Sequence, residues 1–285
     1  MNNSYLSGLL KLKIWSKLVF LSVFTAIFMT IQVSCFSNTD KKTEPESYIK
    51  NIVDADGSLK RVIESKVLRI GTDPNSGMPY IKKATFSKDY NGFEADISKY
   101  ISNELGCSAK FVPTNWVNLY KGLEDNSYDI ILNAIEKPED DKTIAKNIGF
   151  STSYFINTQQ IVVLKNNNKT KFLIDLKNKK VGVLADSTAK VLVSEINKMK
   201  HAGITLVMYT NIDDLFSSLK KNLIEAVITD TPIGTWNCQD NKNNCKLVGI
   251  TLLPQNYVIA VRKEDRALLN GIDAILRNGK KNNKI

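Results

Sequence analysis

The sequence has a single histidine, His201, and only four cysteines among its 285 residues. His201 falls at the expected end of a helix, and no serine or cysteine is accompanied by a candidate base. Histidine, cysteine and carboxylate residues do not recur at a spacing typical of metal ligands. We therefore predict no catalytic residues, no metal site and no cofactor.

Glycine and proline are also few, at 14 and 7 residues, in a chain that is 43% hydrophobic and 24% charged. This balance excludes collagen-like, disordered and membrane-bundle proteins and is ordinary for folded domains. The formal net charge is +10, or +7 (10 − 3) without Lys11, Lys13 and Lys17. Basic residues are scattered and not interleaved with aromatic ones, which indicates a solvated surface facing an anionic membrane and no nucleic-acid partner.

The N-terminal region differs in character from the rest of the chain. Residues 1–17 contain lysines but no acidic residue, and residues 18–33 are almost wholly apolar. A basic start, an apolar run shorter than about twenty residues and a small residue before its end are typical of an export signal. We predict a signal over residues 1–35, with an uncleaved membrane anchor as an alternative.

Cys35 follows the apolar run and resembles the cysteine of a bacterial lipobox, where acylation of the sulfur attaches the mature chain to membrane lipid. Gln32 stands where that motif usually has leucine, so ordinary cleavage is a further alternative. All three outcomes place the folded part outside the cytoplasm, in the periplasm or at the cell surface. Residues 36–57 are polar and lack periodicity, and we predict a tether there.

Two further cysteines, Cys238 and Cys245, bracket a polar stretch that is typical of an exposed loop. Outside the cytoplasm such a pair favours a local disulfide. Zinc ligation is the weaker alternative, because no histidine is nearby. We expect Cys107 to be a small buried side chain.

From residue 67 onward, short apolar segments alternate with segments of helical periodicity. Expected strands cover 67–72, 111–112, 128–135, 155–164, 180–184, 204–209, 224–229 and 257–262. Expected helices cover 58–66, 93–105, 119–123, 188–200, 213–221 and 268–276. This alternation predicts an α/β fold with largely parallel sheets, whose ligands bind beyond the carboxyl ends of the strands. Polar segments follow four expected strands, at 73–75, 133–136, 186–188 and 230–232.

Several short stretches along residues 67–278 follow one another in the order typical of a known family. They include Leu68-Arg69-Ile70-Gly71-Thr72-Asp73-Pro74, Gly92-Phe93-Glu94-Ala95-Asp96-Ile97, Phe150-Ser151-Thr152-Ser153-Tyr154, Lys180-Val181-Gly182-Val183, Asp230-Thr231-Pro232 and Ile259-Ala260-Val261-Arg262-Lys263. Together they resemble the family 3 solute-binding proteins, the polar amino-acid receptors of ABC importers. The resemblance implies a two-lobed periplasmic-binding-protein type II fold, with two doubly wound sheets joined by two crossover strands. Lobe 1 would cover 58–157 and 252–285, and lobe 2 would cover 158–251.

The resemblance also implies a ligand site between the lobes. Tyr80 and Trp116 match positions whose rings sandwich the side chain of the ligand, with ordinary core packing as the alternative. Asp73 and Asp230 match acids that meet the positive groups of the ligand. For Asp230, helix capping is a rival interpretation, and the two roles are compatible.

Two departures from the family pattern bear on the identity of the ligand. Many members end the loop after the Asp-Ile-Ile strand with an arginine that clamps a carboxylate, whereas this chain has Asp140 there. Lys137 and Lys142 would be poorer partners for a carboxylate than a bidentate guanidinium. On the second lobe, Asp186 replaces the glycine that usually precedes a Ser-Thr pair at a helix start, where backbone amides form an anion nest.

We predict that a cationic solute, such as a polyamine, a basic amino acid or a related amine, binds in this acidic cleft. The alternative is that Asp140 and Asp186 are surface caps that face away from it. The predicted ligand-binding residues are Asp73, Tyr80, Trp116, Asn133, Ala134, Glu136, Asp140, Asp186, Ser187, Thr188 and Asp230. The predicted function is that of an extracytoplasmic substrate-binding receptor of an ABC importer, which closes on a small polar solute by hinge motion. Its partners would be an ABC permease and, through Cys35, membrane lipid.

Two other classes of function stay open. The family fold also occurs in a dehydratase, in peptidoglycan-cleaving enzymes and in sensor domains, and Glu136 in a cleft could act as the acid of a lyase. A scaffold or sensor that has lost its ligand is the other alternative, because the carboxylate-clamping arginine is missing.

Overall fold

The structure is a computed structural model that describes residues 45–85, 89–138, 145–239 and 243–285. The predicted signal, Cys35, residues 36–44 of the predicted tether and Asp140 lie outside these residues. Among the described residues, no helix combines the length and the apolar character that a membrane crossing needs.

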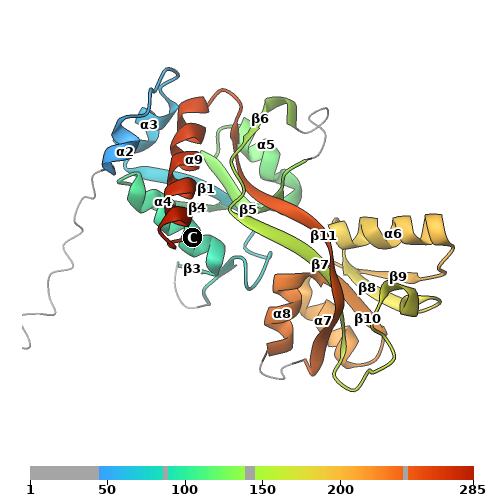
Figure 1. The fold of residues 1–285 in the computed structure, drawn as a ribbon. Coiled ribbons are helices and arrows are strands. Elements are labelled where there is room, and N and C mark those ends of the chain that lie inside the picture. Colours follow the sequence, from blue (N-terminus) through green and yellow to red (C-terminus); the bar gives the residue numbers. More distant parts are fainter. Residues whose placement is uncertain (1–44, 86–88, 139–144, 240–242) are drawn as a thin grey trace, which may run out of the picture. The chain divides into compact units, whose positions relative to one another are not determined.

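Three parallel strands form the first half of the main sheet. In spatial order they are β4 (Ser108–Pro113), β1 (Val67–Thr72) and β5 (Ile130–Glu136). Strands that are covered on both faces need continuous apolar runs, and Ile130, Ile131 and Leu132 are fully buried. The helices around this half are α3 (Ser58–Ser65), α4 (Phe93–Glu104), α5 (Leu119–Glu124) and α9 (Arg266–Lys281). We call these elements lobe 1 (Figure 1).

The second half of the sheet repeats this plan. Its parallel strands are, in spatial order, β10 (Ala226–Asp230), β8 (Lys180–Leu184) and β9 (Thr205–Tyr209). Its helices are α6 (Thr188–Lys200), α7 (Ile212–Lys220) and α8 (Thr231–Cys238). We call these elements lobe 2. Side-chain caps begin two of these helices, because Ser187 precedes α6 and Asn211 precedes α7 with an oxygen that accepts a backbone N–H.

Two long antiparallel strands, β7 (Phe155–Leu164) and β11 (Cys245–Arg262), run between the lobes (Figure 1). β11 pairs with β5 of lobe 1, and β7 pairs with β10 of lobe 2. The two-lobed α/β class is therefore confirmed, but the two expected sheets form one continuous hydrogen-bonded path. A short strand, β6 (Ile148–Phe150), also pairs with β11. The residue boundaries proposed for the lobes stay a prediction.

The chain before β1 differs from the predicted tether. Residues 45–57 include the helical turn α2 (Ser47–Lys50), which packs against α9. Ile49 is buried, and the Tyr48 hydroxyl donates a hydrogen bond to Glu104 of α4. Burying these apolar side chains offsets the entropy of ordering a segment whose composition is otherwise typical of a tether.

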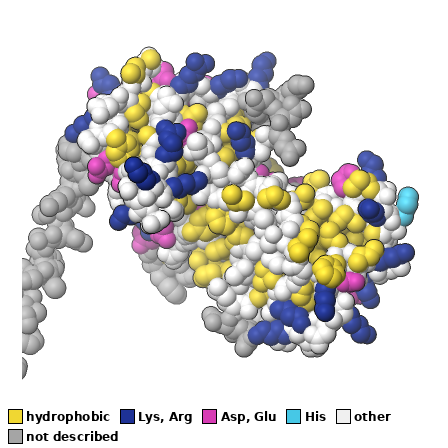
Figure 2. Space-filling model, viewed as in Figure 1, with side chains coloured by type: hydrophobic (Ala, Val, Ile, Leu, Met, Phe, Trp, Pro, Cys, Tyr) yellow, Lys and Arg dark blue, Asp and Glu magenta, His cyan; other side chains and the backbone are white. Residues whose placement is uncertain are grey.

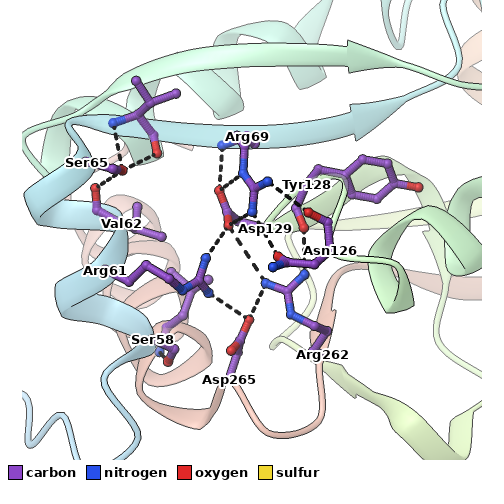
Figure 3. A network of polar contacts seen from close by, with 12 residues as sticks. Ser58, Arg61, Val62, Ser65, Arg69, Asn126, Tyr128, Asp129, Arg262 and Asp265 are labelled. Atoms are coloured by element: carbon purple, nitrogen blue, oxygen red, sulfur yellow. Dashed lines mark hydrogen bonds and ion pairs between the residues drawn. The ribbon is translucent and has the colours of Figure 1, made fainter.

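Five charged side chains from separate segments of lobe 1 meet in one network (Figure 3). Asp129, just before β5, accepts hydrogen bonds from Arg61 at 2.6 Å and from Arg69 at 2.7 Å. Asp265, just before α9, accepts from Arg61 at 3.1 Å and from Arg262 at 2.5 Å. Burial acts to raise the pKa of Asp129, but the bonds from Arg69 and Arg61 outweigh it and hold the pKa below its ordinary value. The network ties α3, β1, β11 and the start of α9 together.

The remaining singled-out residues lie at the surface or in the core. Cys238 and Cys245 form a disulfide that joins the end of α8 to the first residue of β11, and Cys107 is free and buried. His201 is exposed and follows the last residue of α6. Figure 2 shows Lys and Arg side chains spread over the face in view instead of gathered in a single stripe, which is the arrangement expected for a solvated surface.

Candidate functional site

A cavity of about 460 Å³ lies where the parallel strands of both lobes end. Its lining includes the residues after β1, β8 and β9 and the last residues of β5 and β10. This is the position that the topology of parallel α/β sheets favours for a ligand. The lining contains every predicted ligand-binding residue except Asn133, which is buried beneath the cavity, and Asp140, which lies outside the described residues.

Asp230, the last residue of β10, carries a carboxylate whose position is fixed by three donors. Its Oδ2 accepts hydrogen bonds from the hydroxyls of Tyr80 at 2.9 Å and Tyr257 at 2.7 Å, and its Oδ1 accepts from Gln159 Nε2 at 2.6 Å. Asp230 occupies the N-cap position of α8 but makes no capping bond there. Burial, and then the charge of Asp230, raise the pKa of Tyr80 and Tyr257, so both phenols stay protonated donors.

Asp73, directly after β1, is engaged by local backbone donors. Its Oδ1 accepts from the Asn75 N–H at 2.9 Å, and its Oδ2 accepts from the Trp116 N–H at 3.0 Å. The second bond holds the Trp116 backbone beside the cavity, and Trp116 is 40% exposed. Tyr80 is only 2% exposed and packs edge-on against Phe93. Tyr80 is therefore a core residue as well as part of the wall, and the aromatic sandwich stays a prediction.

Glu136, the last residue of β5, connects the two lobes. Its Oε2 accepts hydrogen bonds from the Thr188 hydroxyl at 2.7 Å and from Gln255 Nε2 at 2.8 Å. Thr188 is the first residue of α6 in lobe 2, and Gln255 lies on β11. Burial raises the pKa of Glu136, the bond from Thr188 opposes this, and the charge of Asp230 adds to it.

The start of α6 is capped by Ser187, whose Oγ accepts from the Lys190 N–H at 3.3 Å. Asp186 precedes this cap with a φ of 53°, and its exposed side chain forms an ion pair with Lys190 at 3.6 Å. Asp186 lines the cavity but does not cap the helix. Of the two lysines considered as substitutes for the missing arginine, Lys137 is exposed and is not among the lining residues. The other, Lys142, lies outside the described residues.

Asn133 is fully buried and organises the end of the sheet beneath the cavity. Its Oδ1 accepts from the Thr72 hydroxyl at 2.7 Å and the Asp73 N–H at 2.8 Å, and its Nδ2 donates to Ser76 Oγ at 2.9 Å. Asn133 is not among the residues that line the cavity, and its contact with a ligand stays a prediction. A buried amide has to be satisfied by its surroundings, and here neighbouring residues supply partners for both its oxygen and its nitrogen.

A buried glutamate holds the backbone of the next residue, Ala134, which lines the cavity at a φ of 50°. Oε1 of Glu94 accepts from the Ala134 N–H at 2.6 Å and from the hydroxyl of Tyr154. Glu94 is 0% exposed, and burial raises its pKa to about 7 although both bonds oppose the shift. The charge of Asp230 adds to the increase.

We expect Glu94→Gln to change how stability depends on pH. Because folding raises the pKa of Glu94 from 4.5 to about 7, the stability contributed by its protonated form is complete below 4.5 and lost as the pH rises through about 7. Relative to the variant, the wild-type chain should lose up to about 3 kcal/mol of unfolding free energy between about pH 5 and pH 8. Urea unfolding at both pH values measures this, with Glu195→Gln on the exposed face of α6 as control. A difference from wild type that is independent of pH would contradict the assignment.

Several lining residues were not predicted, and they include Tyr120, Tyr257 and residues 210–212. Thr210 and Asn211 follow β9 directly, so they carry the same strand-end signal as the predicted segments. Tyr257 lies inside β11 and carries no local signal, since only the pairing of β11 with β5 brings it to the cavity. Among the residues that the structure describes, no group of His, Cys, Asp and Glu could hold a metal ion.

Comparison with known proteins gives one family. The profile of the bacterial extracellular solute-binding proteins, family 3, matches residues 68–285. The chain is 26% identical over 229 residues to the L-cystine-binding protein TcyJ of Escherichia coli, covering 80% of this chain and 82% of TcyJ. It is 26% identical over 238 residues to the L-arginine-binding protein of Pseudomonas aeruginosa, covering 78% of this chain and 88% of that protein.

Solved structures agree with these matches. An ancestral arginine-binding protein bound to arginine is 32% identical with a TM-score of 0.66, over 77% of this chain and 94% of that chain. The ancestral amino acid-binding protein AncCDT-1, a precursor of cyclohexadienyl dehydratase, is 26% identical with a TM-score of 0.67, over 80% and 95%. The relatives are named for different amino acids, so the comparisons identify a fold and a family but no single ligand.

Proposed function

Because this chain belongs to family 3 of the bacterial extracellular solute-binding proteins, we propose that it is an extracytoplasmic receptor that captures a small cationic solute for an ABC permease. The observation that carries the cationic specificity is the Asp230 carboxylate, held at the cavity by three side-chain donors. Asp73, Glu136 and Asp186 line the same cavity, whose lining within the described residues includes no lysine, arginine or histidine.

An ammonium or guanidinium group is the partner that this cavity favours. Hydrogen bonds that involve a charged group contribute about 1.5–3 kcal/mol each, more than bonds between neutral groups. A cation would also relieve the repulsion between Asp230 and Glu136 that helps to raise the pKa of Glu136. Trp116 and Tyr120 in the lining add aromatic rings, whose faces attract cations.

Hinge closure between the lobes is the proposed mode of capture. β7 and β11 connect the lobes, and the bond between Glu136 and Thr188 reaches from the end of β5 to the start of α6. Closing two lobes over a ligand excludes water and strengthens each polar contact inside. We propose the lobe boundaries predicted above, 58–157 with 252–285 and 158–251.

Export and lipid attachment belong to the same proposal. The basic and apolar residues of 1–35 support an export signal, and the position of Cys35 supports acylation. Mass spectrometry of the mature protein checks this, because lipoprotein maturation adds acyl mass to Cys35 and cleaves the peptide bond before it, which removes residues 1–34. An unmodified cysteine at that position would contradict lipidation without affecting the cavity.

A lyase is the second candidate function, supported by the likeness to AncCDT-1, a precursor of a dehydratase. Glu136 would be its acid, because its raised pKa brings protonation closer to neutral pH. The receptor function is better supported, since Glu136 Oε2 is engaged by Thr188 and Gln255.

Isothermal titration calorimetry of the full-length chain in mild detergent tests the proposal. Arginine, lysine, putrescine, agmatine and spermidine are the cations, and glutamate and glutamine are the acidic and neutral controls. We expect saturable binding of at least one cation. At a hundredfold excess over Kd, such a ligand raises the free energy of unfolding by about 2.7 kcal/mol. Binding of glutamate or glutamine with no response to any cation would refute cationic specificity. Conversion of a bound solute to product would favour the lyase.

A further inference from the structure

The cavity lacks a cationic partner for a carboxylate among its described lining residues. Four carboxylates line it, and no lysine, arginine or histidine does. A carboxylate binds best to a guanidinium, through two parallel charge-assisted hydrogen bonds. A basic amino acid placed here would have partners for its ammonium groups, but its carboxylate would face like charges.

The start of α6 is the part of the lining that favours an anion without a cationic side chain. The carboxylate of Glu136 already lies against it. The N-terminal turn of a helix carries unpaired N–H groups and a partial positive charge. Glu136 reaches this turn from the other lobe through the Thr188 hydroxyl, at 2.7 Å. Gln255 holds the same oxygen at 2.8 Å, which fixes the carboxylate from a second direction.

Two further contacts reinforce this arrangement. Ser187 uses its Oγ to accept the Lys190 N–H, so the cap of α6 is also supplied from within the chain. The ammonium of Lys190 is paired with Asp186 at 3.6 Å. The Thr188 hydroxyl, the Lys190 N–H and the Lys190 ammonium at the start of α6 therefore each have a partner within the chain.

We propose that the cavity selects amines and guanidines that lack a carboxylate, such as diamines, polyamines and decarboxylated basic amino acids, because Glu136 occupies the place where a ligand carboxylate would meet α6. This inference rests on the proposed cation receptor and specifies its substrate class. Asp230 binds the cationic end of the ligand, and Glu136 both completes the acidic wall and excludes a second carboxylate.

Matched ligand pairs provide the test, because the members of each pair differ by one carboxylate. The pairs are arginine with agmatine, lysine with cadaverine and ornithine with putrescine. Calorimetry on the full-length chain in mild detergent gives a Kd for each compound. We expect the decarboxylated member to bind about tenfold or more tightly than its amino acid in at least one pair, since the carboxylate would be desolvated without a partner.

The variant Glu136→Gln separates the charge of this residue from its size. The glutamine keeps an oxygen that accepts from Thr188 or Gln255, but it no longer repels a ligand carboxylate. We expect the preference for the decarboxylated member to fall to about threefold or less in this variant, through tighter binding of the amino acid. Glu195→Gln, on the exposed face of α6, makes the same chemical change away from the cavity and should keep the full preference.

The outcomes distinguish this inference from the function on which it rests. Equal or tighter binding of the amino acids in every pair would overturn the inference and leave the cation receptor standing. A preference that survives Glu136→Gln unchanged would show that another group excludes the carboxylate. Failure of all six compounds and of spermidine to bind would refute the cation receptor itself. Arginine methyl ester adds a check on size, because it should bind like agmatine if charge alone excludes the carboxylate.

Discussion

Replacing Asp230 with asparagine should weaken binding of the cationic solute by about 10- to 100-fold, with little effect on folding. The substitution keeps the size of the side chain but removes its charge, and hydrogen bonds to charged groups contribute about 1.5–3 kcal/mol. The hydroxyls of Tyr80 and Tyr257 can accept as well as donate, so they can adapt to an amide at this position. Calorimetry with whichever cation binds the wild-type chain measures the loss.

Asp213→Asn is the matched control for this experiment. Asp213 is an exposed residue in the first turn of α7 and is not among the residues that line the cavity. It carries the same change in net charge, so long-range effects appear equally in both variants, and we expect a change in Kd of less than about twofold. Equal losses in the two variants would mean that Asp230 acts only through net charge. Unchanged affinity in Asp230→Asn would remove the observation on which cationic specificity rests.

The regular elements are predictable from the sequence because local periodicity and burial agree in them. β1, β7, β8 and α6 have the bounds expected from their apolar patterns and caps. β11 differs most from its apolar pattern, which indicates a strand only from Tyr257, whereas the family resemblance implies a crossover strand near 247–261 and the observed strand covers Cys245–Arg262. Its first part contains several apolar residues but is half-exposed, and it is a strand because it pairs with β7, with register shifts between Val248 and Gln255. Pairing between distant segments leaves no periodic signal in either one.

In the candidate site too, features with a local sequence signal were predicted and features set by distant contacts were not. Asp73, Asp186 and Asp230 lie at or beyond strand ends, where the topology of parallel sheets places ligand contacts, and they line the cavity. The position of a polar residue at a strand end does not fix the direction of its side chain, as Asn133 shows. Its neighbours Ala134 and Glu136 line the cavity, whereas Asn133 points into the lobe to satisfy three partners. No pattern in the segment separates these orientations.

Contacts between the lobes could not be predicted from the sequence, because their members lie far apart along the chain. The bond between Glu136 and Thr188 joins residues 52 positions apart, and the bond between Tyr80 and Asp230 joins residues 150 apart. Each member was identified as a site residue, but nothing local shows that the protein supplies partners for its own acids. The inference that Glu136 takes the place of a ligand carboxylate comes from this geometry alone.

The charged network of lobe 1 should contribute more to stability than any single contact at the cavity. We expect Asp129→Asn to lower the free energy of unfolding by about 2–3 kcal/mol at pH 7, because the buried carboxylate loses charge-assisted hydrogen bonds from two arginines that are themselves partly exposed. The Asp129 side chain is 2% exposed and accepts from two arginines. Arg262, only 8% exposed, would retain Asp265 as its remaining acidic partner in the network. Urea unfolding followed by circular dichroism measures the loss through the shift in midpoint.

The pH dependence and a surface control make this prediction specific. The pKa of Asp129 is lowered from 3.8 in the fold, so its contribution is present above 3.8 and disappears as the pH falls through the folded pKa. The difference between wild type and Asp129→Asn should therefore narrow only below about pH 4. Asp125→Asn breaks an ion pair with Lys121 at 2.7 Å in which both side chains are more than half exposed, and it should cost less than about 1 kcal/mol. Similar losses in the two variants would show that burial adds nothing, and the network would then be no more than a surface feature.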